Sequence, residues 1–164
     1  MILIGLGANL THPIHGPPRA TLEAALASIA QAGAPVTRRS RWYRSAPVPA
    51  SDQPWFVNAV ASLRSDLGPK ALLELLHEVE ASFGRVRRER NEPRVVDLDL
   101  LSYGDLVSDP SETPVLPHPR LAERAFVLLP LAELAPDWHH PRTGVSVAEL
   151  CRRLPPEQTA EPFA

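Results

Sequence analysis

Apolar residues along this chain fall into two patterns, short runs bounded by turn residues and stripes with helical spacing. The short runs predict β-strands. They cover residues 2–6, 36–43, 55–63 and 95–103. The clearest helical stripe begins at Pro69, which suits a first turn, and ends at Gly84, which suits a helix stop. Its apolar members are Leu72, Leu76, Val79 and Phe83. An earlier stripe predicts a helix from Ala20 to about Gly33.

The order of these elements is β-α-β-β-α-β, which is the order of a ferredoxin-like α+β domain. Such a domain is an antiparallel sheet with helices packed on it. Two more helices are predicted over 126–134 and 147–154. We therefore expect one domain over residues 1–154 and a frayed, proline-containing tail over 155–164. Because this fold supports many activities, the function has to be argued from a site.

Composition excludes several classes of partner. The chain has 164 residues, 44% of them hydrophobic, and a formal net charge of −2. That charge gives no general attraction to nucleic acid or to an anionic membrane, so we expect neither as a partner. No segment approaches the roughly 20 apolar residues of a membrane span, and the short N-terminal run reads as a strand, not a signal peptide. With a single cysteine, Cys151, the chain suits a reducing compartment. We expect a cytoplasmic monomer.

Two aspartates lie on the last predicted strand. Residues two apart on a strand share a face, with Cα atoms roughly 7 Å apart. Asp97 and Asp99 therefore point the same way, and the alternation continues on that side to Leu101 and Tyr103. Two parallel carboxylates suit a hard cation such as Mg²⁺ between them. The alternative is a solvated strand face, which is the commoner explanation for an isolated Asp-x-Asp.

An arginine cluster precedes the aspartates. Five of the ten residues in 85–94 are Arg and two are Glu. The chain uses sixteen Arg against one Lys, which is a compositional bias, so only this clustering is informative. Arginines beside a metal pair suit a metal-bound polyphosphate. We assign that role to Arg85 and Arg94, whereas Arg88 and Arg90 could equally be solvated. The P-loop motif is absent, so arginines and metal would have to hold the phosphates.

In addition to these features, the chain resembles the 6-hydroxymethyl-7,8-dihydropterin pyrophosphokinase family of folate biosynthesis, from Gly5 to about Pro141. The segments that carry the resemblance are Gly5-Leu-Gly-Ala-Asn-Leu10, Tyr43-Arg-Ser-Ala-Pro-Val48, Asp52-Gln-Pro-Trp-Phe-Val-Asn-Ala59, Gly84-Arg-Val-Arg87, Pro93-Arg-Val-Val-Asp-Leu-Asp-Leu-Leu101 and Leu116-Pro-His-Pro119. Each is weak alone, but together they occur in the family's order and spacing.

The resemblance implies a set of site residues. Asp97 and Asp99 would bind two Mg²⁺ ions, and Arg85 and Arg94 would be catalytic through the transferring phosphates. Nucleotide-binding positions would be His77, Glu80, Arg87, Arg88, Leu100, His118 and Arg124. Pterin-binding positions would be Ser45, Ala46, Val48, Phe56, Asn58 and Phe126, with the two phenylalanines stacking on the ring. Segments 44–54 and 85–94 would be mobile loops.

The implied reaction is transfer of pyrophosphate from ATP to the hydroxymethyl group of the pterin, with release of AMP. Three features depart from the family pattern: Asn91-Glu92, Pro119, and a longer stretch after Asn9. Two alternatives are open. A metal-dependent nucleotidyltransferase also uses paired carboxylates but releases pyrophosphate. A non-enzymatic ferredoxin-like module that binds RNA would need exposed aromatics and a basic face, which this composition suits poorly.

Overall fold

The computed structural model describes residues 1–85 and 93–163. Its six strands form one antiparallel sheet in the described part of the chain. They are β1 (Ile2–Ala8), β2 (Val36–Arg39), β3 (Tyr43–Ser45), β4 (Phe56–Leu63), β5 (Asp97–Tyr103) and β6 (Ala160–Pro162). The helices are α1 (Pro18–Gln31), α2 (Pro69–Ser82), α3 (Ala125–Leu134) and α4 (Val147–Arg152), with a 3-10 turn η1 at Leu121–Glu123. The predicted α+β fold with a ferredoxin-like order is confirmed.

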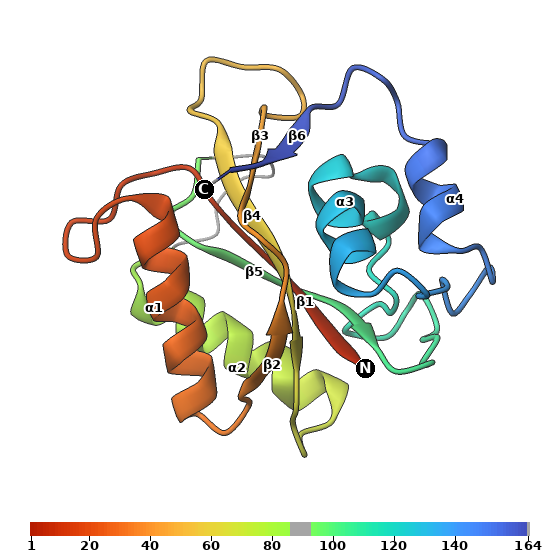
Figure 1. Ribbon diagram of the computed structural model, residues 1–164. Coiled ribbons are helices and arrows are strands. Elements are labelled where there is room, and N and C mark those ends of the chain that lie inside the picture. Colours follow the sequence, from red (N-terminus) through yellow and green to blue (C-terminus); the bar gives the residue numbers. More distant parts are fainter. Residues whose placement is uncertain (86–92, 164) are drawn as a thin grey trace.

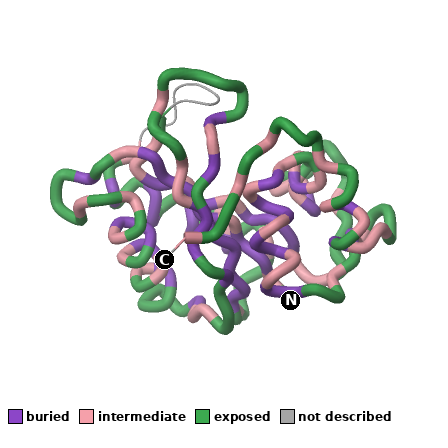
Figure 2. Tube along the Cα trace, turned by 45° about the horizontal axis from the view of Figure 1, so that its top comes forward, coloured by how far each residue is buried: buried purple, intermediate pink, exposed green. Residues whose placement is uncertain are grey.

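Helices cover both faces of the sheet. Figure 1 shows α1 and α2 on one side of the strands and α3 and α4 on the other. Each side has its own apolar cluster: Ile4 and Leu98 belong to the α1–α2 side, and Leu3 and Leu128 to the α3–α4 side. Figure 2 shows the buried positions along the middle of the molecule and the exposed ones mainly in the connections. The sheet is therefore a buried central layer, and its strand ends are where ligands can reach it.

Strand β4 is central, as its run of apolar residues predicts, and it pairs with β1, β2 and β3. The single strand predicted over 36–43 is instead two strands. From Arg39 to Tyr43 the chain takes four steps, while the partner strand takes three, from Ala61 to Asn58. Ser40 fills the break, because its hydroxyl accepts a hydrogen bond from Val60 N at 3.1 Å. A side chain thus replaces a ladder carbonyl at this bulge.

The C-terminal segment, which was expected to be frayed, is paired with the sheet over the described residues. Strand β6 pairs with β3, Ala46 N donates to Thr159 O at 3.3 Å, and Phe163 N donates to Trp42 O at 3.0 Å. The segment covers an edge of β3 that would otherwise present unpaired backbone groups. The prolines permit this because an edge strand does not need every N–H.

The two helices that cover the first face end as predicted. Gly33 and Gly84 have φ values of 102° and 87°, a left-handed conformation that glycine adopts without a Cβ clash. Pro69 occupies the first turn of α2.

Within the described residues, none of the helices combines the length and the apolar character that a membrane crossing requires.

Candidate active site

The two aspartates lie at the start of β5, beside the glycines of β1. Asp97 is paired in register with Gly7 and Asp99 with Gly5. As predicted, the intervening Leu98 is fully buried on the α1–α2 side. The predicted alternation fails further along, because a register shift leaves Leu101 without a partner on β1. Tyr103 consequently packs against the α1–α2 cluster and not on the aspartate face.

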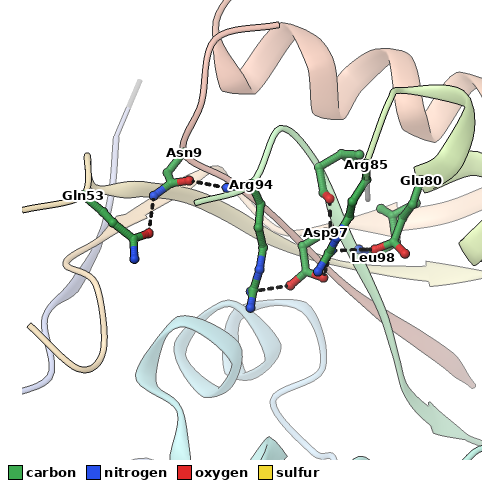
Figure 3. A network of polar contacts seen from close by, with 8 residues as sticks. Asn9, Gln53, Glu80, Arg85, Arg94, Asp97 and Leu98 are labelled. Carbon is green, nitrogen blue, oxygen red and sulfur yellow. Dashed lines mark hydrogen bonds and ion pairs between the residues drawn. The ribbon is translucent and has the colours of Figure 1, made fainter. Parts of the chain in front are cut away.

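Arg85 and Arg94 converge on one carboxylate from opposite sides (Figure 3). Arg94 NH1 lies 2.9 Å from Asp97 Oδ2, and Arg85 NH1 donates to Asp97 Oδ1. Burial opposes the charge on Arg85, but Asp97 and Glu80 outweigh it and raise the arginine's pKa. Both arginines have a buried Nε without a hydrogen-bond partner among the described residues. Buried unpaired donors are costly for stability and are more typical of binding sites.

Glu80 lies beneath Arg85 and does not line the cleft. Its carboxylate is 2.9 Å from Arg85 NH1 and accepts from Leu98 N at 2.8 Å, and the residue is 2% exposed. Glu80 was expected to bind the nucleotide, and in the structure it is enclosed between α2 and β5. It holds Arg85 and the backbone at the start of β5.

Of four other residues that were expected to contact the nucleotide, the structure describes two. His77 is exposed on α2 and lines neither of the hollows described below. Leu100 is 3% exposed and packs in the α1–α2 core, so it supports the strand from behind. Arg87 and Arg88 lie outside the described residues.

Asn9 connects the β3–β4 loop to the segment before β5. Its Oδ1 accepts from Arg94 N at 2.8 Å, and its Nδ2 donates to Gln53 Oε1 and Pro54 O, each at 3.0 Å (Figure 3). The backbone N–H groups of Asn9 and Leu10 both donate to Arg94 O. Three of these hydrogen bonds fix the backbone from which the Arg94 side chain reaches Asp97, and the other two hold Asn9 against the β3–β4 loop.

A cavity of about 640 Å³ opens beside the aspartates. Its volume is in the range of small-molecule sites. All six expected pterin positions line it: Ser45, Ala46, Val48, Phe56, Asn58 and Phe126. They come from β3, the following loop, β4 and the start of α3, so the cavity exists only after the sheet and α3 have packed.

Asn58 is the buried polar group of this cavity. It is 4% exposed, and its Oδ1 accepts from Ser45 Oγ at 2.6 Å. Gly7 is paired with Asn58, and a Cβ on Gly7 would come within 3.1 Å of Asn58 Nδ2. The absence of a side chain at Gly7 therefore leaves the amide room at the cavity wall.

A smaller recess of about 250 Å³ adjoins the cavity and contains the charged groups. Its lining residues are Arg85, Arg94, Asp97, Asp99, His118, Pro119, Arg120 and Arg124. Burial, with the nearby Arg124 cation, lowers the pKa of His118 to about 4. Its Nδ1 accepts from Arg120 N at 3.2 Å, which leaves the proton of the neutral ring on Nε2.

Several lining residues were not predicted as site residues. Gln53 and Gly7 lie within segments that carry the family resemblance, so a signal for them existed. Arg120, Pro155 and Gln158 also line the cleft, but nothing in their local sequence indicates it. The pairing of β6 with β3 brings Gln158 to the cavity wall, and this pairing depends on tertiary contacts.

The donors on this site fit a hard divalent cation. Within the described residues no group of three or more His, Cys, Asp or Glu side chains could hold a metal. Asp97 and Asp99 alone provide oxygen donors on one strand face. Mg²⁺ is characteristically held by one or two carboxylates, with waters and substrate phosphates supplying the other ligands. The residues present therefore suit magnesium bound together with a phosphorylated ligand.

A ferredoxin-like domain with paired carboxylates, converging arginines and an adjoining apolar cavity is the arrangement of a phosphotransferase. Comparison with known proteins identifies the family. Residues 3–136 match the family model of 7,8-dihydro-6-hydroxymethylpterin-pyrophosphokinase. The chain therefore belongs to the 7,8-dihydro-6-hydroxymethylpterin-pyrophosphokinase family.

Curated relatives support the same assignment. Proteins named 2-amino-4-hydroxy-6-hydroxymethyldihydropteridine pyrophosphokinase include one from Synechocystis sp., which is 41% identical over 93% of this chain and 75% of its own length. Another, from Methylorubrum extorquens, is 46% identical over 82% of each chain. A third, from Pseudomonas aeruginosa, is 41% identical over 94% of this chain and 91% of its own.

Solved structures support the fold. The HPPK-DHPS protein of Plasmodium falciparum, in a crystal structure with pteroate, superposes with a TM-score of 0.70 at 11% identity. The match covers 93% of this chain and 44% of that one, so this chain corresponds to under half of the larger protein.

Proposed function

We propose that this protein transfers pyrophosphate from ATP to the hydroxymethyl group of 6-hydroxymethyl-7,8-dihydropterin and releases AMP. The observation that carries the proposal is the continuity of the two hollows. Five residues line both of them: Arg94, Asp97, Asp99, Arg120 and Arg124. An organic acceptor in the larger cavity would therefore face phosphates in the recess across a shared wall.

The larger cavity supplies what a pterin needs. Phe56 and Phe126 provide apolar ring faces for a flat heterocycle. The pair of Ser45 and Asn58 provides polar groups at the buried end, where a pterin edge offers both donors and acceptors. Val48 lies on the loop after β3 and is half exposed, so it would cover the ligand from the solvent side.

The recess supplies what a polyphosphate needs. Asp97 and Asp99 would hold two Mg²⁺ ions, which when bound neutralise phosphate oxygens and align the leaving group. Arg94 and Arg85 would exchange part of their interaction with Asp97 for phosphate oxygens, where their charge stabilises the transition state. His118, neutral at pH 7, would donate through Nε2 to the nucleotide.

In the reaction, the hydroxymethyl oxygen attacks the β-phosphorus and the bond to the α-phosphate oxygen breaks. Such phosphoryl transfers are largely dissociative, so positioning and electrostatics contribute more than base catalysis. We assign no general base. The loops at 44–54 and 85–94 remain our candidates for closure, and residues 86–92 of the second lie outside the described part.

Replacement of the aspartates tests the assignment. Asp97→Ala and Asp99→Asn should each abolish AMP release from ATP, Mg²⁺ and the pterin, because the carboxylates that hold the metal are lost. Asp97→Ala also removes the carboxylate that Arg85 and Arg94 share, so Asp97→Asn should accompany it as a better-folded variant. Asp137→Asn, at an exposed residue that lines neither hollow, is the matched control. Near-normal AMP release by Asp97→Asn and Asp99→Asn would reject the metal assignment.

Product identity separates this reaction from nucleotidyl transfer. A pyrophosphokinase releases AMP, whereas a nucleotidyltransferase releases pyrophosphate from the same nucleotide. Arg94→Ala should lower the turnover number more than it lowers pterin affinity. A variant that lost pterin binding alone would contradict the phosphate role.

A further inference from the structure

We propose that Arg120 is an additional phosphate-binding residue, which contacts the pyrophosphate portion of the nucleotide. This inference rests on the proposed function and deepens it, because it adds one residue to the phosphate site. Neither the aspartate motif nor the arginine cluster of the sequence includes Arg120.

The first argument is position. Of the five residues that line both the cavity and the recess, four are already assigned to the metal, the phosphates or the nucleotide. Arg120 is the fifth. The group that is transferred from nucleotide to pterin has to lie against this shared wall, because it leaves a ligand in the recess and joins a ligand in the cavity. A cation there would contact the transferred phosphates more readily than the nucleoside.

The second argument is charge. Arg85 and Arg94 are engaged by Asp97 in the structure. Within the described residues, by contrast, neither Arg120 nor Arg124 takes part in an ion pair. An arginine at the wall of a partly closed recess without a carboxylate favours an incoming anion, and its planar guanidinium suits phosphate oxygens.

Arg120 lines the recess together with His118 and Arg124, and its charge acts on both of them. Burial is the main reason that the pKa values of His118 and Arg124 are lowered, and the positive charge of Arg120 lowers both further. Two guanidinium groups and an uncharged imidazole thus share a small volume. A bound polyphosphate would remove the repulsion between the cations, which adds to its affinity.

The backbone of Arg120 is well anchored, so the side chain starts from a fixed point. Its N–H donates to His118 Nδ1 at 3.2 Å, and its carbonyl accepts from Glu123 N at 3.1 Å at the start of η1. Replacement of the side chain leaves both bonds available. The effect of a substitution can therefore be assigned to the guanidinium.

Ligand binding by calorimetry tests the proposal with Arg120→Gln, Arg120→Lys and the control Arg19→Gln. Arg19 is exposed on α1 and paired with Glu23. The probes are a non-hydrolysable α,β-methylene ATP with Mg²⁺, AMP, and 6-hydroxymethylpterin. Arg120→Gln should weaken the ATP analogue about 10- to 100-fold, the range of one hydrogen bond to a charged group. Arg120→Lys should weaken it less, because the charge is kept. AMP and pterin affinities should be unchanged, as should all affinities of Arg19→Gln.

Three outcomes would overturn the role of Arg120. Arg120→Gln could bind the ATP analogue as tightly as the wild type does. It could lose affinity for AMP to the same extent as for the analogue, or it could lose affinity for the pterin alone. The proposed function would fail differently: the wild-type protein itself would not bind the analogue or would not release AMP. Unfolding curves of each variant, matched to the wild type, exclude a general loss of structure.

Discussion

Glu80 stabilises the site from below, and its replacement by alanine should destabilise the whole domain. The carboxylate accepts from Arg85 NH1 at 2.9 Å and from Leu98 N at 2.8 Å. The side chains of Glu80 and Arg85 are 3% and 6% exposed. Solvent therefore cannot replace the lost charge of Glu80→Ala, and the backbone N–H of Leu98 loses its acceptor.

The magnitude follows from these contacts. Breaking a buried ion pair costs about 3–5 kcal/mol. Arg85 keeps Asp97 as a second partner, so the lower limit of about 3 kcal/mol applies. The unsatisfied Leu98 N–H adds about 1 kcal/mol or more. The expected loss of about 4 kcal/mol is a large fraction of the 5–15 kcal/mol of a typical domain. Glu80→Gln keeps an acceptor for Leu98 N and should lose about half as much.

Urea unfolding at equilibrium measures this loss directly. With a slope of about 2 kcal/mol per molar urea, Glu80→Ala should lower the midpoint by about 2 M. Glu78→Ala is the matched control, since Glu78 lies two residues before Glu80 on α2 and is exposed. This replacement should change the free energy of unfolding by about 0.5 kcal/mol at most.

A double-mutant cycle with Arg85→Ala separates the ion pair from other effects, because the double variant should lose less than the sum of the single ones. An unfolding midpoint of Glu80→Ala equal to that of Glu78→Ala would refute the argument. A Glu80→Gln protein with normal stability but much weaker ATP binding would do so as well, because it would show that Glu80 contacts the nucleotide.

Three further predictions concern other parts of the cleft. The His118 ring should titrate near pH 4 by NMR, because burial and Arg124 lower its pKa from 6.5 to about 4. Between these pH values the unfolded chain binds more protons than the folded one, so His118 lowers the free energy of unfolding by up to about 3 kcal/mol as pH falls from 6.5 to 4. A stability difference between wild type and His118→Gln that did not change with pH would contradict this prediction. Asn9→Ala removes three side-chain hydrogen bonds and should cost about 3 kcal/mol in thermal unfolding, with a lower turnover number because the Arg94 backbone is freed. Gln158→Ala should cost about 1–2 kcal/mol and weaken pterin binding, because its amide bonds the backbone on both sides of Arg124; unchanged pterin affinity in a titration would reject the positioning role.

Local sequence was most informative where one physical requirement dominated. The stripe of α2 and the glycine at its end require only a helix with one buried face, and both lie where predicted. The alternation around Asp97 and Asp99 also held, because Leu98 had to enter the core. Alternation failed at Tyr103 because β5 has one extra residue, Leu101, opposite β1, which changes the face on which the later residues of β5 lie.

The tertiary structure places some of the residues expected from the family resemblance at the cavity and encloses others in the core. The residues expected around the pterin all line one cavity, since their positions on β3, β4 and α3 converge in space. Glu80, which was expected at the nucleotide, is enclosed beneath Arg85. Helical spacing gives the direction of a side chain from its axis, but the packing of α2 on β5 decides whether solvent reaches it.

The sequence by itself therefore determined the element order, the α+β class, the carboxylate pair and the family to which the chain belongs. These depend on periodicity, turn residues and ordered motifs, all of which are local along the chain. Only the tertiary structure decided that Arg120 and Gln158 line the cleft and that β6 completes the sheet beside β3. The physical reason is that these contacts join segments with no periodic or motif relation, and they form only when the sheet, η1 and the C-terminal segment pack together.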